Sequence, residues 1–254
     1  MSGLVWITGA SSGLGRAAAL EFARRGYRVA VTARRADELD KLSVEASGFL
    51  GDISVFPGDV TDATAMATVV AEIENGIGPI GVAILNAGSY TPVTARGFTA
   101  HAVREQFEIN VMGTAHGLEA LLPRMIGRQT GKIYLMGSVA GYRGLPLASA
   151  YGATKAALNN MAEALHLELR PLGVTLGIIN PGFVATPLTA KNSHPMPFLM
   201  AADKAASRLV DGVLDGRFEV TFPVIFTFIL KIVRCLPDAL YFPLVARATR
   251  GRKA

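Results

Sequence analysis

Short apolar runs alternate with longer amphipathic runs along nearly the whole chain. The apolar runs are bounded by turn residues and predict β-strands. They occupy residues 4–7, 28–33, 53–57, 82–85, 132–136, 174–179 and 218–222. Strands that alternate with helices are typical of a parallel sheet with helices on both faces. Because no repeat, low-complexity tract or linker interrupts this alternation, we expect one doubly wound α/β domain with about seven strands.

Polar and glycine residues follow the predicted strands at the points where the strands end. A glycine-rich loop follows the first strand, and shorter signals follow the next five strands: Arg34, Asp59, Asn86, Ser138 and Pro181-Gly182. Open α/β sheets bind ligands outside the carboxyl ends of their strands. The sequence therefore predicts a binding site along this edge of the sheet.

The glycine-rich loop is TGASSGLG, at residues 8–15, between the first strand and a predicted helix at 16–25 that Gly26 ends. Glycines permit a tight turn and a close approach of the backbone to a ligand, and a helix N-terminus attracts a pyrophosphate. The spacing TGxxxGxG is a variant of the general dinucleotide pattern. In this strand–turn–helix context it predicts a dinucleotide site.

Tyr151 and Lys155 lie four residues apart in the run YGATK, about one helical turn, so they share a helix face. A phenol has an ordinary pKa of about 10 and is a poor proton donor at neutral pH. A lysine charge beside it favours the phenolate and would lower this pKa toward the working pH. With the glycine loop upstream, the pair predicts proton exchange with a carbonyl or alcohol oxygen.

The combined motifs resemble the short-chain dehydrogenase/reductase family over about residues 3–223. They are TGASSGLG, Asn86-Ala87-Gly88, Asn110, Ser138, YGATK and Pro181-Gly182, in the family's order and spacing. The resemblance implies a Rossmann-type fold, a nicotinamide cofactor and hydride transfer to or from a carbonyl carbon. It also implies a homodimer or homotetramer, formed through the helices that carry Asn110 and Tyr151.

Four residues are the expected catalytic group: Asn110, Ser138, Tyr151 and Lys155. The Ser138 hydroxyl can hold the substrate oxygen near the phenol. By resemblance, Asn110 holds a water in a proton relay ending at Lys155, although a buried, satisfied amide is the alternative reading. Lys155 would also hold the nicotinamide ribose.

The expected cofactor contacts follow the sheet edge. By resemblance, Asp59 and Val60 flank the adenine, the Asn86 motif lies along the ribose on the adenine side, and Val184 and Thr186 hold the carboxamide. The whole expected set is Gly9, Ser11, Ser12, Gly13, Leu14, Gly15, Arg34, Arg35, Asp59, Val60, Asn86, Ala87, Gly88, Tyr151, Lys155, Pro181, Gly182, Val184 and Thr186.

The end of the second strand favours NADP(H) over NAD(H). Enzymes that use NAD have an acid there to bind the ribose hydroxyls, but this chain has Ala33 followed by Arg34 and Arg35. Arginine binds a 2′-phosphate through its planar fork of donors, whereas an acid would repel it. The alternative is that Arg34 only caps a surface turn.

Composition restricts the possible metal sites, binding partners and cellular compartment. The chain has 254 residues, half of them hydrophobic, and one cysteine, Cys235, which excludes an internal disulfide framework and fits a reducing compartment. No Cys or His pairs have zinc-ligand spacing, and His116, His166 and His194 receive no catalytic role. Because the first strand begins at residue 4, we expect a cytoplasmic protein without a cleaved leader. The net charge of +5 comes without a nucleic-acid motif, so no nucleic-acid partner is expected.

The sequence says less about the substrate than about the cofactor. Residues 187–200 contain prolines and apolar side chains and predict a lid over the substrate. Residues 224–254 form an apolar, basic extension whose apolar stretches are too short to span a membrane. Three roles stay open for it: closing the substrate pocket, forming a subunit interface, or lying peripherally on a membrane.

The sequence thus predicts an NADP(H)-dependent oxidoreductase that interconverts a carbonyl and an alcohol, with an apolar or lipid-like substrate. Two alternatives are a catalytically silent NADPH sensor and a membrane-docked scaffold. The first would be expected to lack Tyr151 or Lys155, and both are present.

Overall fold

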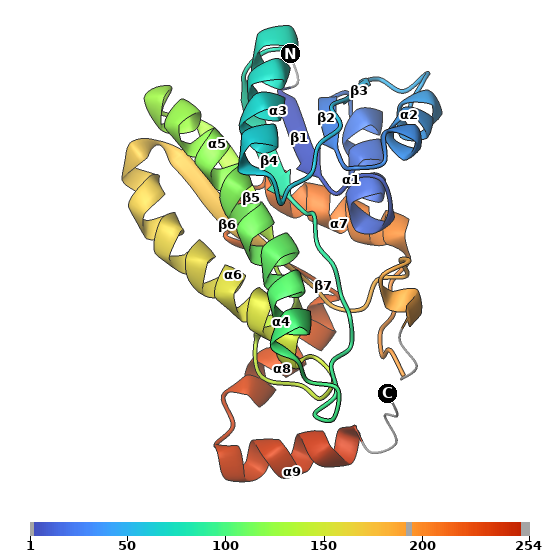
Figure 1. The fold of residues 1–254 in the computed structure, drawn as a ribbon, viewed down its shortest axis with the longest axis vertical. Helices are drawn as coiled ribbons and strands as arrows, with labels where there is room; N and C mark the ends of the chain where they lie inside the picture. Colours follow the sequence, from blue (N-terminus) through green and yellow to red (C-terminus); the bar gives the residue numbers. More distant parts are fainter. Residues whose placement is uncertain (1–2, 192–194, 250–254) are drawn as a thin grey trace.

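A computed structural model describes residues 3–191 and 195–249. Its centre is a seven-stranded parallel sheet in the order β3-β2-β1-β4-β5-β6-β7 (Figure 1). Its strands are β1 (Leu4–Thr8), β2 (Arg28–Thr32), β3 (Ile53–Val55), β4 (Ile80–Leu85), β5 (Gly131–Met136), β6 (Val174–Pro181) and β7 (Glu219–Phe222). The chain order reverses at β1, between β2 and β4, which is the switch point where doubly wound sheets bind ligands.

Helices cover both faces of the sheet, so the predicted Rossmann-type α/β class is confirmed. The helices are α1 (Gly13–Arg24), α2 (Ala36–Glu45), α3 (Ala63–Gly76), α4 (Ala100–Phe107), α5 (Gly113–Gly127), α6 (Ser149–Leu169), α7 (Ala202–Leu214), α8 (Val224–Arg234) and α9 (Asp238–Ala248). One core cluster joins the sheet to α1, α2 and α7, and a second joins its other face to α3, α5 and α6. Both cores combine mainly aliphatic side chains from the strands with those of the helices that cover them.

The seven predicted strands all form, and their ends differ in ways that affect the site. β6 continues two residues beyond the predicted end, because Pro181 still lies opposite Phe222 of β7. β3 ends at Val55, two residues early, although the Phe56 N–H still donates to the Val31 carbonyl of β2 at 3.0 Å. α1 begins at Gly13 rather than residue 16, so the glycine loop itself makes the first helical turn.

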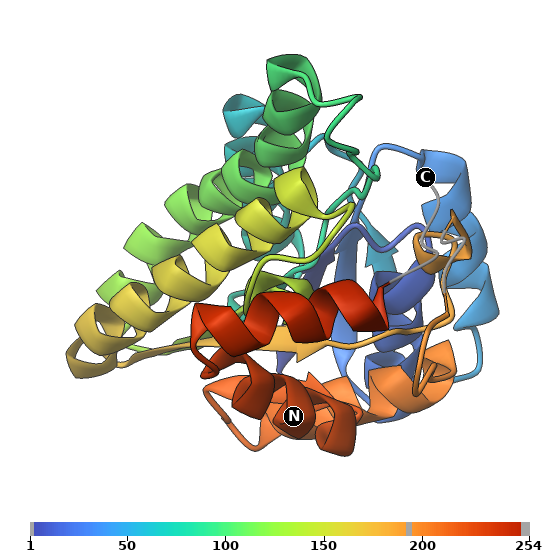
Figure 2. The same cartoon turned by 90° about the horizontal axis from the view of Figure 1, so that it is seen from below.

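The C-terminal extension folds as two helices, α8 and α9, at one end of the molecule (Figure 1). Figure 2 looks onto this end and shows α9 lying across it, with α6 to one side and α7 to the other. Among the helices of residues 3–191 and 195–249, none has the length and hydropathy to cross a bilayer. Arg250, Arg252 and Lys253 lie outside the described residues, as do residues 192–194 of the expected lid.

Candidate active site

The glycine loop has the geometry that a bound pyrophosphate needs. Gly9 and Gly13 have φ values of +68° and +61°, in the left-handed region that favours glycine. A Cβ on Gly9 would lie 2.7 Å from the Ala87 Cα, so the loop packs backbone against backbone. Ser12 precedes α1 but its side chain accepts no capping hydrogen bond. The first-turn amides of α1 are therefore available to a ligand anion.

Asn86 braces this loop from β4. Its Nδ2 donates to the carbonyl oxygens of Thr8 (2.9 Å) and Gly9 (3.2 Å), and its backbone N–H donates to Thr8 Oγ1 (3.0 Å). A Cβ on Gly15 would fall 2.3 Å from Asn86 Nδ2, so only glycine fits there. The side chain expected along the ribose thus also fixes the phosphate loop.

The two arginines after β2 lie at the nucleotide end of the site. The Arg35 guanidinium donates to Ser11 Oγ at 3.0 Å, and an Arg34 nitrogen lies 3.9 Å from an Asp59 oxygen. Burial raises the pKa of Asp59, but hydrogen bonds from Thr61 and the Arg34 charge outweigh it, and the pKa is lower than usual. Arg34 is 72% exposed, and both arginines line the cavity.

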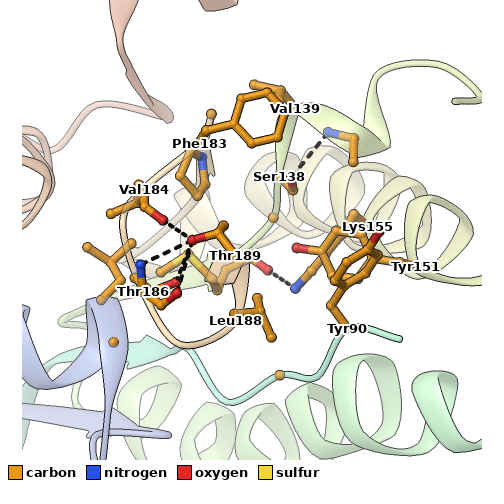
Figure 3. Close-up of a pocket in the computed structure, with 18 of the residues that line it drawn as sticks. Tyr90, Ser138, Val139, Tyr151, Lys155, Phe183, Val184, Thr186, Leu188 and Thr189 are labelled. Atoms are coloured by element: carbon orange, nitrogen blue, oxygen red, sulfur yellow. Dashed lines mark hydrogen bonds between the residues drawn. The ribbon is translucent and has the colours of Figure 1, made fainter. Parts of the chain in front are cut away.

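Ser138, Tyr151 and Lys155 meet beyond the end of β5 (Figure 3). Ser138 begins a short 3-10 turn, Val139–Gly141, and its hydroxyl accepts a hydrogen bond from the Ala140 N–H at 3.1 Å. Lys155 is 3% exposed; its Nζ donates to the Met136 carbonyl at 2.7 Å and lies 5.5 Å from the centre of the Tyr151 ring. The three expected groups therefore share one corner of the cavity, in which Ser138 and Lys155 are buried and Tyr151 is partly exposed.

The acidities in this corner differ from the sequence expectation. Burial raises the pKa of Tyr151 to about 12, although a hydrogen bond with Ser138 lowers it in part. Burial lowers the pKa of Lys155 to about 7, so the amine carries only part of its charge at neutral pH. The motif predicts a lysine that makes the phenol more acidic, but desolvation is the larger effect here. Tyr151 is therefore fully protonated at neutral pH.

Asn110 lies behind the corner, in a π-helical turn (Glu108–Met112) between α4 and α5. Its Oδ1 accepts from the Ser89 N–H (2.7 Å), and its Nδ2 donates to the Ser89 carbonyl and to Thr154 Oγ1 (both 3.0 Å). Fully buried, it is the one expected site residue that does not line the cavity. A Cβ on Gly88 would lie 3.1 Å from Asn110 Oδ1 and 3.7 Å from Lys155 Nζ, so both groups approach Gly88.

The segment after β6 returns to the glycine loop. A Cβ on Gly13 would lie 3.4 Å from the Thr186 Cβ, which places the segment expected to hold the carboxamide against the glycine loop. The expected lid folds back on this segment: the Ala185 N–H donates to the Met200 carbonyl and the Met200 N–H to the Phe183 carbonyl, both at 2.9 Å. A short 3-10 turn (Thr189–Lys191) lies between them.

One cavity of about 1420 Å³ contains all these groups except Asn110. Its far wall comes from α8 and α9, through Phe226, Leu230, Val233, Val245 and other apolar residues. The extension thus lines the same cavity as the expected catalytic residues. The sequence left this position open among three roles, because residues 224–230 carry no charged side chain and no polar period marks an inner face.

Two further residues escaped the sequence analysis. Tyr90 lines the cavity with its ring against Tyr151, the centroids 5.0 Å apart. Arg143 fastens the loop between β5 and α6 to the extension: it donates to the carbonyls of Arg234 (3.0 Å) and Leu236 (2.5 Å), and its guanidinium lies 3.7 Å from the Tyr241 ring centre. No motif marks either residue.

Of the three histidines given no catalytic role from the sequence, the two within the described residues contact backbone carbonyl groups. His116 Nδ1 lies 2.9 Å from the Val60 carbonyl oxygen, and His166 Nδ1 lies 2.7 Å from that of Leu176. His194 lies outside the described residues. No group of three or more His, Cys, Asp or Glu side chains suited to a metal occurs in residues 3–191 and 195–249.

Known proteins share this sequence and fold. The family described as short chain dehydrogenase matches residues 4–197. An uncharacterized oxidoreductase of Myxococcus xanthus is 38% identical over 92% of this chain and 93% of its own length. The 11-beta-hydroxysteroid dehydrogenase-like 3 protein of Arabidopsis thaliana is 32% identical over 91% of this chain and 77% of its own. A short-chain dehydrogenase from Sphingobium yanoikuyae, solved with NADPH, is 26% identical and superimposes with a TM-score of 0.78, covering 93% and 97% of the two chains. The chain therefore belongs to the short-chain dehydrogenase family of oxidoreductases.

Proposed function

We propose that the protein is an NADP(H)-dependent oxidoreductase that interconverts a carbonyl and an alcohol on an apolar substrate. The observation that carries this proposal is the single cavity, with the glycine loop at one end, an apolar helical wall at the other and Tyr151 between them. A bound nicotinamide would supply the hydride. Every other step is assigned to side chains of this chain.

The residues at the nucleotide end fit such a cofactor. The open N-terminus of α1 would hold the pyrophosphate, and the glycines at 9, 13 and 15 leave it room. Arg34 and Arg35 would hold a 2′-phosphate, while Asp59 and Val60 flank the adenine. Lys155 would hold the nicotinamide ribose, and the segment from Pro181 to Thr186 would hold the carboxamide.

Proton transfer falls to Tyr151. The Ser138 hydroxyl and the phenol hold the carbonyl oxygen, which fixes the carbon for hydride attack. Tyr151 then gives its proton to the oxygen as negative charge develops there. Because its pKa is about 12, the phenol is present in the donating form at neutral pH. Lys155, with its pKa lowered to about 7, can return a proton to the site, and Asn110 would position the route to it.

Two observations favour NADP(H) as the coenzyme. Arg34 and Arg35 stand where an acid would bind the NAD ribose, and Arg35 is already held by Ser11. The Sphingobium yanoikuyae enzyme of the same fold was solved with NADPH. Comparing the KM values for NADPH and NADH tests this choice, and a preference for NADH would overturn it.

The substrate is proposed to be a long-chain or polycyclic ketone, aldehyde or alcohol. The wall from α8, α9 and the lid offers aliphatic and aromatic side chains, which select apolar surface rather than charge. The name of the Arabidopsis thaliana relative indicates a steroid-type substrate for that protein. Peripheral contact with a membrane fits this substrate class, because apolar substrates partition into bilayers. A homodimer or homotetramer is proposed from the family resemblance.

NADPH consumption across carbonyls graded from short and polar to long-chain and steroid-like tests the proposal. We expect activity to rise with apolar size, and Tyr151→Phe to lower kcat about a thousand-fold while NADPH binding is retained. Retained activity in the variant would refute the role of Tyr151. Tight NADPH binding without turnover of any carbonyl would instead favour the sensor alternative.

A further inference from the structure

The helices α8 and α9 expose an unusual amount of apolar surface. Among the described residues, sixteen large apolar side chains are exposed, and eight of them lie on these two helices. They are Val224, Ile225, Phe228, Ile229, Ile232, Leu240, Phe242 and Leu244, with exposed fractions from 45% to 67%. We call these eight residues the apolar face. Monomeric soluble proteins rarely leave so concentrated an apolar area uncovered.

On α8 the exposed positions and the cavity-lining positions lie on different sides of the helix. Residues 224, 228 and 232 are four apart and form one exposed stripe, whereas Phe226, Leu230 and Val233 line the cavity. Ile229 belongs to both sets, and so does Leu244 on α9. The cavity therefore reaches the surface within the apolar face, between the two helices.

The charge of the chain is concentrated in the same segment. Residues 220–254 contain six Lys or Arg and one acid, Asp238. Of the 25 basic and 20 acidic residues in the chain, this leaves 19 of each elsewhere, so the whole net charge of +5 belongs to these last residues. Asp238 is paired with Arg143 and Lys231 with Glu219, while Arg234 and Arg247, both exposed, have no acidic partner in the part of the chain that the structure describes.

This charge decides between two occupants of the apolar face. A second copy of the chain, joined by a two-fold axis, would bring the same patch against itself and oppose two segments of charge +5. An anionic bilayer instead attracts each basic residue while its acyl region covers the apolar side chains. We propose that α8 and α9 dock the protein on an anionic membrane surface, with the mouth of the cavity facing the lipid.

The proposal rests on the proposed function in one respect: an apolar carbonyl or alcohol dissolved in the bilayer would enter the cavity past Ile229 and Leu244 without crossing water. Docking itself requires neither substrate nor cofactor. The two ideas can therefore fail separately.

Vesicle flotation tests the docking. We would use phosphatidylcholine vesicles with and without about a third phosphatidylglycerol, and compare the wild-type protein with Phe228→Ser/Phe242→Ser. Both phenylalanines are more than 60% exposed, so the fold should tolerate the change. The matched control is Leu50→Ser/Leu167→Ser, which alters apolar residues outside the extension that are still more exposed (86% and 74%).

We expect binding to the anionic vesicles only, a loss of roughly ten-fold or more in the Phe228/Phe242 variant, and no change in the control. Arg247→Glu should weaken binding similarly, whereas Arg96→Glu, at an exposed position outside the extension, should not. Absence of wild-type binding, or equal loss in the control pair, would overturn the proposal. A stable wild-type oligomer would also overturn the proposal if it does not bind vesicles and if the Phe228/Phe242 substitutions dissociate it.

Turnover separates this proposal from the proposed function. With a short soluble aldehyde, the Phe228/Phe242 variant should match the wild-type rate. With a long-chain aldehyde carried in anionic vesicles, it should turn over several-fold more slowly. Vesicle binding by a protein that consumes no NADPH with any carbonyl would leave the docking intact and refute only the proposed function. Equal rates on the vesicle-borne aldehyde would refute entry from the bilayer.

Discussion

The two ends of the cavity are built by different means. At the nucleotide end the packing is close: Gly9 and Gly15 leave no room for a Cβ, and Asn86 ties two strands together with three hydrogen bonds. At the substrate end, apolar side chains of α8 and α9 form the wall, and Arg143 links these helices to the loop between β5 and α6 by hydrogen bonds. The first construction permits few residue types, whereas the second permits any apolar residues of suitable size. A sequence motif therefore marks the nucleotide end, whereas no motif marks the substrate end.

The sharpest test of the nucleotide end is Gly15→Val. Its Cβ would lie 2.3 Å from Asn86 Nδ2 and 2.8 Å from the Gly9 carbonyl oxygen, so the loop must move. We expect NADPH affinity, measured by fluorescence titration, to fall at least about a hundred-fold. The matched control is Gly76→Ala on α3, where a Cβ meets nothing within 4 Å and binding should be unchanged. Undiminished NADPH binding by Gly15→Val would contradict the packing described here.

The chemistry between the two ends should show a directional pH dependence. Oxidation of an alcohol needs the Tyr151 phenolate, and since its pKa is about 12 the phenolate fraction grows with pH up to that value. We expect kcat/KM for oxidation to rise from pH 7 to 10 by up to about ten-fold per unit. The rise should be less steep than this limit, because Lys155 loses its charge above about pH 7. Reduction needs the protonated phenol, whose fraction barely changes over this range. An oxidation rate that falls with pH would exclude Tyr151 as the base.

The double substitution Arg34→Ala/Arg35→Ala tests how the nucleotide end distinguishes NADPH from NADH. Loss of the two guanidinium groups should raise the KM for NADPH about ten-fold and leave the KM for NADH nearly unchanged. Steady-state kinetics with both coenzymes measures the difference. An equal rise in the KM for both coenzymes would mean that the arginines do not bind the 2′-phosphate.

Arg143→Ala should have the smallest effect, and at the substrate end only. Its hydrogen bonds to Arg234 and Leu236 hold the α8–α9 turn, so their loss should cost about 1 kcal/mol of stability and raise the KM for long substrates a few-fold. The KM for short substrates and the affinity for NADPH should not change. Arg217→Ala removes only an exposed pair with Asp215 and serves as the control. A change in NADPH affinity with Arg143→Ala would show that the two ends are not separable in this way.

The sequence predicted those features that local chemistry determines. All seven strands form where their apolar runs lie, and the expected site residues line one cavity, with Asn110 the exception. The acidity of Tyr151 was not predictable, because the motif reveals the nearby lysine but not the burial that raises the pKa of the phenol. The inner face of α8 was hidden for a related reason: a segment that is apolar all round has no polar side to mark the surface.

The aromatic contacts of Phe226 have a consequence for how ligands bind. This cavity-wall residue of α8 stacks on Phe198 of the lid, with ring centroids 5.7 Å apart, and a Cβ on Gly182 would lie 2.9 Å from its ring. A substrate that displaces Phe226 therefore also shifts the segment proposed to hold the nicotinamide. Such energetic coupling is reciprocal, so the nucleotide must change the affinity for substrate by the same factor as the substrate changes the affinity for nucleotide. Affinities measured with either ligand alone will differ from those in the ternary complex by that shared factor.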